Sequence, residues 1–105
     1  MLAGKAAHYQ RYDGATAQLA EWITVPAAST VIIEGFGALR PQFRQYVYYG
    51  IWVNTPPKVR LTRGLARGHE DAAQWRLWQQ SDQEYLNLNR PDMAASLIID
   101  GTTTY

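Results

Sequence analysis

Apolar residues are arranged along the chain both at helical spacing and in short continuous runs, and the two patterns predict alternating helices and strands. In residues 8–25, Leu19, Trp22 and Ile23 have helical spacing, which predicts a short helix. Residues 31–35 read VIIEG, an apolar run rich in β-branched residues that ends in an acid and a glycine. Such a run is typical of a strand buried on both faces of a parallel sheet, so we expect helices to cover it.

The second half of the chain continues this alternation. A short helical segment is predicted to begin near Pro41, because proline is tolerated in a first helical turn, and residues 51–53 form the next predicted strand. Apolar spacing predicts a helix in 59–66 that Gly64 and Gly68 interrupt or end, and the longest helix over 72–89. A last apolar strand lies within 95–101. This order predicts an α/β fold with about three parallel strands and flanking helices.

Length, composition and charge indicate a small single domain with a basic middle segment. The chain has 105 residues, 47% of them hydrophobic, and no cysteine, which fits a single domain over residues 1–105 without disulfides or a thiolate metal site. No apolar run has the length of a membrane helix, and the first residues lack a secretion signal, so we expect a cytoplasmic protein. The net charge is +1, but residues 40–67 hold six basic and no acidic residues. This basic segment favours an anionic ligand such as phosphate.

Three segments together resemble the C-terminal half of uridine kinase-like P-loop kinases. They read VIIEGFGAL, YGIWVNTPPKVRLTRGLARG and ASLIIDGT, with a tryptophan-rich helix before the last one, and the resemblance covers residues 30–102. It implies a partial three-layer parallel-sheet fold of the P-loop kinase type. It also implies an ATP-dependent phosphotransferase of the uridine or nucleoside kinase type, with ATP and magnesium as cofactors and a small-molecule acceptor.

The resemblance assigns roles to four residues. Glu34 matches the acidic residue after the family's VIIEG-type strand, which implies a catalytic carboxylate and magnesium ligand beside the transferred phosphate. Arg63 and Arg67 match arginines of the family's lid in an RLxRxxxR pattern, where guanidinium groups neutralise charge on phosphoryl oxygens. Arg60, the first arginine of that pattern, is expected to help bind the nucleotide. Spacing alone favours a solvated helix face for the arginines and a turn-capping role for Glu34.

Part of the kinase site is absent from this sequence. No GxxxxGK[ST] motif occurs, so the backbone amides that cradle the phosphates and the lysine that reaches them are missing. Gly64 and Gly68 stand where the family's lid often has a further arginine and an acidic residue. We therefore expect a truncated kinase relative that is inactive unless another polypeptide supplies the first half.

Two other function classes stay open. A non-catalytic, kinase-derived module would use an uncovered sheet edge and the aromatic residues Trp75 and Trp78 to self-associate or to bind a complementing chain, although tryptophans at this spacing are more often core or interface. Nucleic-acid binding through the basic segment is disfavoured by the small net charge. His8 and His69 are expected at the surface, because two distant histidines without cysteines make a poor metal site.

Overall fold

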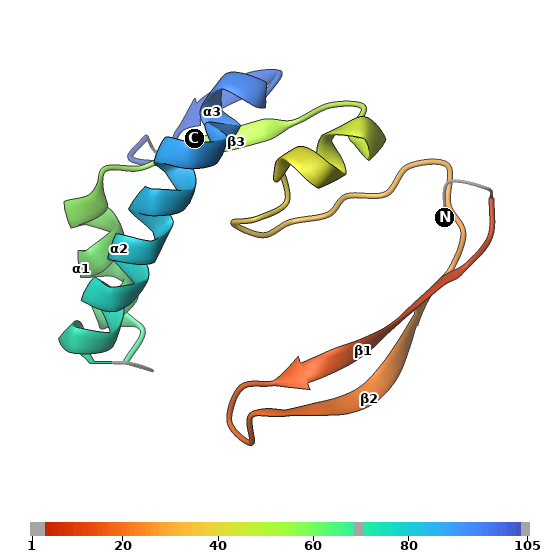
Figure 1. The fold of residues 1–105 in the computed structure, drawn as a ribbon, viewed down its shortest axis with the longest axis horizontal. Helices are drawn as coiled ribbons and strands as arrows, with labels where there is room; N and C mark the ends of the chain where they lie inside the picture. The colour runs from red at the N-terminus through yellow and green to blue at the C-terminus, as the bar shows by residue number, and fades with distance from the viewer. Residues whose placement is uncertain (1–3, 69–70, 104–105) are drawn as a thin grey trace. The chain divides into compact units, whose positions relative to one another are not determined.

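The computed structural model describes residues 4–68 and 71–103 (Figure 1). Contacts between residues divide the chain into two compact units, residues 1–34 and residues 35–105. The N-terminal unit holds an antiparallel pair of strands, and the C-terminal unit holds a parallel pair together with the described helices. The three-layer parallel-sheet fold of the P-loop kinase type is therefore a wrong prediction, because the described strands form two separate sheets of two strands each.

The strands of the N-terminal unit form a β-hairpin. β1 (Ala7–Asp13) pairs antiparallel with β2 (Gln18–Val25). Asp13 begins the connecting turn, where its Oδ1 accepts a hydrogen bond from the backbone amide of Ala15 at 3.0 Å. The helix predicted in residues 8–25 is wrong, because aromatic and β-branched residues on both sides of an Asp-Gly turn favour a hairpin.

Residues 31–33 do not form the predicted strand. They lie in a segment without regular secondary structure, and their side chains are exposed. A β-branched run has strand propensity, but a strand forms only where a neighbouring backbone takes up its hydrogen bonds. Glu34 directly follows this segment, so it does not end a strand, and its side chain is exposed.

The C-terminal unit contains the elements that the second half of the sequence predicts. β3 (Ile51–Asn54) and β4 (Leu97–Asp100) pair in parallel and in register. The described helices of this unit are the 3-10 helix η1 (Pro41–Tyr46), α1 (Pro57–Ala66), α2 (Ala72–Asn89) and α3 (Pro91–Ala94). The two strands, the two longer helices and the helical segment that begins near Pro41 are therefore confirmed. Two parallel strands replace the three that were expected.

Capping residues explain where the long helix α2 begins and ends. Asp71 is the N-cap, and its Oδ1 accepts a hydrogen bond from the backbone amide of Gln74 at 2.9 Å. Arg90 ends the helix in the left-handed conformation, with a φ of 46°, and its guanidinium donates two hydrogen bonds to Asp92. Pro91 then begins α3, because proline is compatible with the first turn of a helix.

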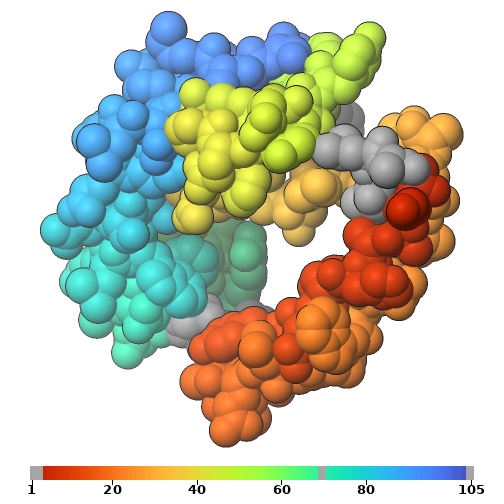
Figure 2. All heavy atoms as spheres, turned by 45° about the vertical axis from the view of Figure 1, so that its right-hand side comes forward, coloured from red at the N-terminus to blue at the C-terminus, as the bar shows by residue number. Residues whose placement is uncertain are grey.

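The packed part of the C-terminal unit joins the segment around η1 to β3 and the end of α2. Leu39 is 7% exposed and packs against Gly50, which precedes β3. Arg44 of η1 links this segment to the end of α2 by hydrogen bonds. Its Nε donates to the carbonyl of Leu39 at 2.9 Å, and its Nη2 donates to the carbonyl of Asn89. In Figure 2 the yellow atoms of this segment lie against the blue atoms near the end of α2.

One face of the β3–β4 pair is open. Ile51, Val53 and Leu97 share this face, because residues paired across neighbouring strands point to the same side, and they are 52%, 55% and 43% exposed. Trp52 points to the other face, where it lines a cavity together with Leu86 of α2. Ile98 shares the face of Trp52 and is 56% exposed, so neither face has the full cover that a parallel sheet usually has.

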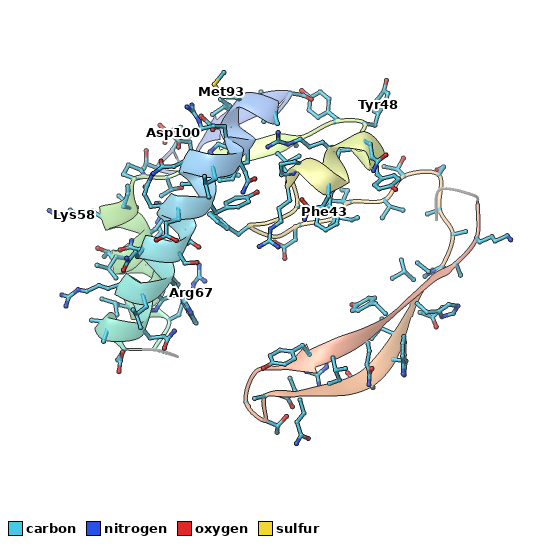
Figure 3. All side chains as sticks on the ribbon, viewed as in Figure 1. Phe43, Tyr48, Lys58, Arg67, Met93 and Asp100 are labelled. Carbon is cyan, nitrogen blue, oxygen red and sulfur yellow. The ribbon has the colours of Figure 1, made fainter. Side chains whose placement is uncertain are left out.

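Large aromatic side chains are exposed along the segment that leads to β3. Figure 3 shows Phe43 on η1 and Tyr48 beyond it, and the second of these side chains is fully exposed. None of the described helices combines the length and the apolar character needed to span a bilayer.

Candidate anion-binding site

The candidate site lies at the carboxyl ends of the two parallel strands. Thr55 directly follows β3, and Gly101 directly follows β4. The two strand ends are joined by a hydrogen bond from the amide of Gly101 to the carbonyl of Asn54 at 2.8 Å. Arg63 of α1 reaches the same place, because its Nη1 donates to the carbonyl of Gly101 at 2.7 Å. In open α/β sheets, ligands bind outside the carboxyl ends of the strands.

Three arginines of the predicted lid pattern line one cavity at this place. Arg60 and Arg63 belong to α1, and Arg67, labelled in Figure 3, directly follows its last residue. Their spacing of three and four residues puts them on one side of the helix. The cavity has a volume of about 420 Å³, and its remaining lining residues are Phe36, Thr55 and Trp75. The structure therefore brings together Arg60, Arg63 and Arg67, which the sequence singled out.

Close packing brings the helix α2 against α1 beside this cavity. Trp75 of α2 lies over Gly64 of α1, and a Cβ on this glycine would be 2.4 Å from Cζ2 and 2.5 Å from Cε2 of the indole. Such distances are too short for carbon atoms, so only glycine allows this approach. The added Cβ would lie close to several consecutive atoms of the six-membered ring at once, so the face of the indole lies over Gly64.

Two buried hydrogen-bond donors of the cavity lining have no partner among the described residues. They are Nε of Arg60 and Nε1 of Trp75. A buried donor without an acceptor costs about 1–3 kcal/mol, and an ordered water, an ion or a ligand at the site can remove that cost. Thr55 adds a hydroxyl group, and the guanidinium groups carry positive charge. The cavity is therefore rich in donors and suited to an oxyanion.

The nearest acidic partner of this arginine group is a weak one. Asp82 of α2 has its Oδ2 at 3.8 Å from Nη1 of Arg60, which is long for an ion pair, and both side chains are partly exposed. Burial raises the pKa of Asp82 above the ordinary value of an aspartate, and the charge of Arg60 only partly opposes that rise. The positive charge of the cavity thus stays largely available to a ligand.

A second cavity of about 330 Å³ in the C-terminal unit has a different character. It lies between the Trp52 face of β3 and the end of α2. Its polar side chains are mostly paired with one another, since Nε2 of Gln83 donates to Oδ1 of Asn87 at 2.9 Å and Arg90 binds Asp92. The unpaired donors of the arginine cavity make that cavity the stronger candidate.

The structure does not test the predicted magnesium site at Glu34. Glu34 belongs to the N-terminal unit, while the arginines belong to the C-terminal unit, so its role beside them stays a prediction. Among residues 4–68 and 71–103, no group of three His, Cys, Asp or Glu side chains could hold a metal ion. A single exposed carboxylate is a poor fit for the several oxygen ligands that magnesium requires.

The structure describes one of the two histidines. His8 is exposed on β1, as expected, and its Nδ1 lies 3.1 Å from Oγ1 of Thr24 on β2. His69, also expected at the surface, lies outside the described residues.

Trp75 is the site residue that sequence reasoning missed. Its spacing from Trp78 pointed to the core or an interface, and the two rings do pack edge to face with centroids 5.2 Å apart. Its place in the cavity depends on the contact with Gly64, and the glycine inside a basic helix is the one feature of the sequence that could have indicated a close neighbour.

Comparison with known proteins does not assign the chain to a family. A scan against models of protein families and a search of curated proteins both found no match to the chain. Its function is therefore inferred from the chemistry of the arginine cavity and from the resemblance carried by its sequence segments.

Proposed function

We propose that this chain contributes the phosphate-binding arginines of an ATP-dependent phosphotransferase of the uridine kinase type. The observation that carries the proposal is the cavity in which Arg60, Arg63 and Arg67 meet Thr55 at the carboxyl ends of two parallel strands. The resemblance of the lid pattern to uridine kinase-like enzymes supports the same role.

The chemistry of phosphoryl transfer suits such a cavity. Catalysis of this reaction consists mostly of positioning and of electrostatic stabilisation, because negative charge is spread over the oxygens of the transferred group. Guanidinium groups donate in a fixed fork that matches phosphate oxygens. Arg63 is already oriented by its hydrogen bond to the carbonyl of Gly101, so little side-chain entropy remains to be lost when a phosphate binds.

Turnover needs groups that these 105 residues do not provide. Because the sequence contains no GxxxxGK[ST] loop, the donors that cradle the phosphates of ATP must come from outside it. We expect this chain to bind phosphates by itself and to transfer none. Magnesium at Glu34 stays a prediction of the resemblance, and the role proposed for the arginines does not depend on it.

The experiment is a calorimetric titration of the purified chain with ATP and, separately, with inorganic triphosphate. We expect saturable binding that Arg63→Ala and Arg67→Ala each weaken by about tenfold or more, as expected for loss of a hydrogen bond between charged groups. Arg76→Ala is the matched control, because Arg76 is an exposed arginine of α2 outside the cavity. A folded chain that binds neither ligand at millimolar concentration, or equal losses in all three variants, would refute the proposal.

A second function, the association module, is favoured by the open face of the β3–β4 pair. Ile51, Val53 and Leu97 leave an apolar surface on strands of a kind that proteins normally cover. Val53→Lys tests this function, since a half-exposed side chain can be replaced without disturbing the monomer. Sedimentation that shows a dimer for the unchanged chain and a monomer for the variant would support association. A monomer in both cases would leave this function without support.

A further inference from the structure

The indole N–H of Trp75 calls for an explanation that packing does not provide. This nitrogen is buried and has no acceptor among the described residues, and an indole N–H can only donate. The ring itself is fixed by its contacts with Gly64 and Trp78, so it cannot easily turn to find an acceptor elsewhere. A donor held in this way costs free energy unless another molecule satisfies it.

The position of the indole relative to α1 indicates which molecule this is. The indole lies over Gly64, which is four residues after Arg60 and adjacent to Arg63, so the ring sits beside the arginines of α1. Nε of Arg60 is the other buried donor of the lining without a partner. Two unpaired donors therefore belong to a cavity that also contains three guanidinium groups, and an acceptor in such surroundings is favoured if it is negatively charged and carries several oxygens.

We infer that Nε1–H of Trp75 and Nε–H of Arg60 donate hydrogen bonds to oxygens of the phosphate group bound in the arginine cavity. This inference rests on the proposed function and adds two ligand-binding donors to it. Both atoms are buried in the absence of ligand, so the lining side chains must shift as the phosphate enters, as side chains at binding sites commonly do. A neutral indole donor adds directionality to a site in which charge alone would attract any anion.

The test combines nuclear magnetic resonance with two variants, and inorganic triphosphate is the probe. The indole N–H of each of the four tryptophans gives its own signal, and Trp75→Phe assigns the relevant one. We expect that signal to move downfield and to saturate at the same concentration as the calorimetric titration. We also expect Trp75→Phe and Arg60→Lys to weaken binding by about tenfold. Arg60→Lys keeps the positive charge and removes the guanidinium donors, Nε among them, so it separates hydrogen bonding by this side chain from electrostatic attraction.

Trp78→Phe is the control, since Trp78 touches the same indole but does not line the cavity. Its binding is expected to match that of the unchanged chain. If triphosphate binds and is weakened by Arg63→Ala, yet leaves the Trp75 signal in place, the inference is overturned and the proposed function survives. If triphosphate does not bind at all, the proposed function fails and this inference fails with it.

Discussion

Replacing Gly64 by alanine tests the contact on which the arginine cavity depends. In an ordinary helix this change stabilises by about 1 kcal/mol, because glycine is a poor helix former. Here the added Cβ would lie 2.4 Å from Cζ2 of Trp75, so the indole or the whole of α2 must move by about 1 Å to restore a normal carbon contact. Overpacking of this kind costs about 1–3 kcal/mol. We expect the cost to exceed the gain and the variant to be destabilised by about 1 kcal/mol.

The assay is a double-mutant cycle with Trp75→Leu, followed by thermal unfolding. Leucine removes the ring atoms that the new Cβ would meet, so Gly64→Ala should become stabilising by about 1 kcal/mol in that background. For a small domain this corresponds to an increase of about 4–8 °C in Tm. Thr62→Ala compared with Thr62→Gly, at an exposed position of α1, measures the helix-propensity term by itself. The reasoning is refuted if Gly64→Ala has the same sign and size in both backgrounds.

Three further predictions concern acidic residues. Asp71→Ala should lower the free energy of unfolding by about 1 kcal/mol in denaturant titrations, because it removes the N-cap of α2. The pKa of Asp82 is raised in the folded chain, so the free energy of unfolding should fall as pH rises through that pKa. Asp82→Asn should abolish this fall. Tm values of both proteins, measured from about pH 3 to about pH 7, would show the difference. Because one exposed carboxylate is a poor magnesium site, Glu34→Gln should leave the binding of ATP with magnesium and of triphosphate without it unchanged; a loss confined to ATP with magnesium would show that Glu34 is a metal ligand.

The elements of the C-terminal unit could be predicted because their signals are local. A capping aspartate at residue 71 and a proline at residue 91 mark the beginning and the end of α2, and both act within one turn of the helix. The arginines could be placed on one side of α1 from their spacing alone. The parallel pairing of β3 with β4 followed from apolar runs separated by helices.

The errors arose where the outcome depends on pairing with another strand. Leu19, Trp22 and Ile23 have a spacing that suits a helix, but the same segment also pairs with a strand before the turn at Asp13, and pairing decides the structure. The run 31–33 has the composition of a strand and finds no strand to pair with among the described residues. Composition and periodicity describe a segment by itself, and they do not report which backbone groups are available to it.

The candidate site, like the fold, could be predicted only where its signals are local. Three arginines follow from a local pattern, whereas the role of Trp75 requires knowledge that α2 packs on Gly64. The two residues are far enough apart in the sequence that spacing does not indicate their contact. Tertiary packing therefore determined which aromatic residue joins the cavity.

The connection between the two parallel strands also has a consequence for folding. Residues 55–96, with α1, α2 and α3, separate β3 from β4, so the strand pair closes a long loop of chain. Loop closure of this kind is entropically costly until the intervening helices have docked, and contacts of high sequence separation form slowly. We expect the helices to form first and the strand pair to close last. Because Arg63 bonds to the carbonyl that directly follows β4, the arginine cavity would be completed only in that final step.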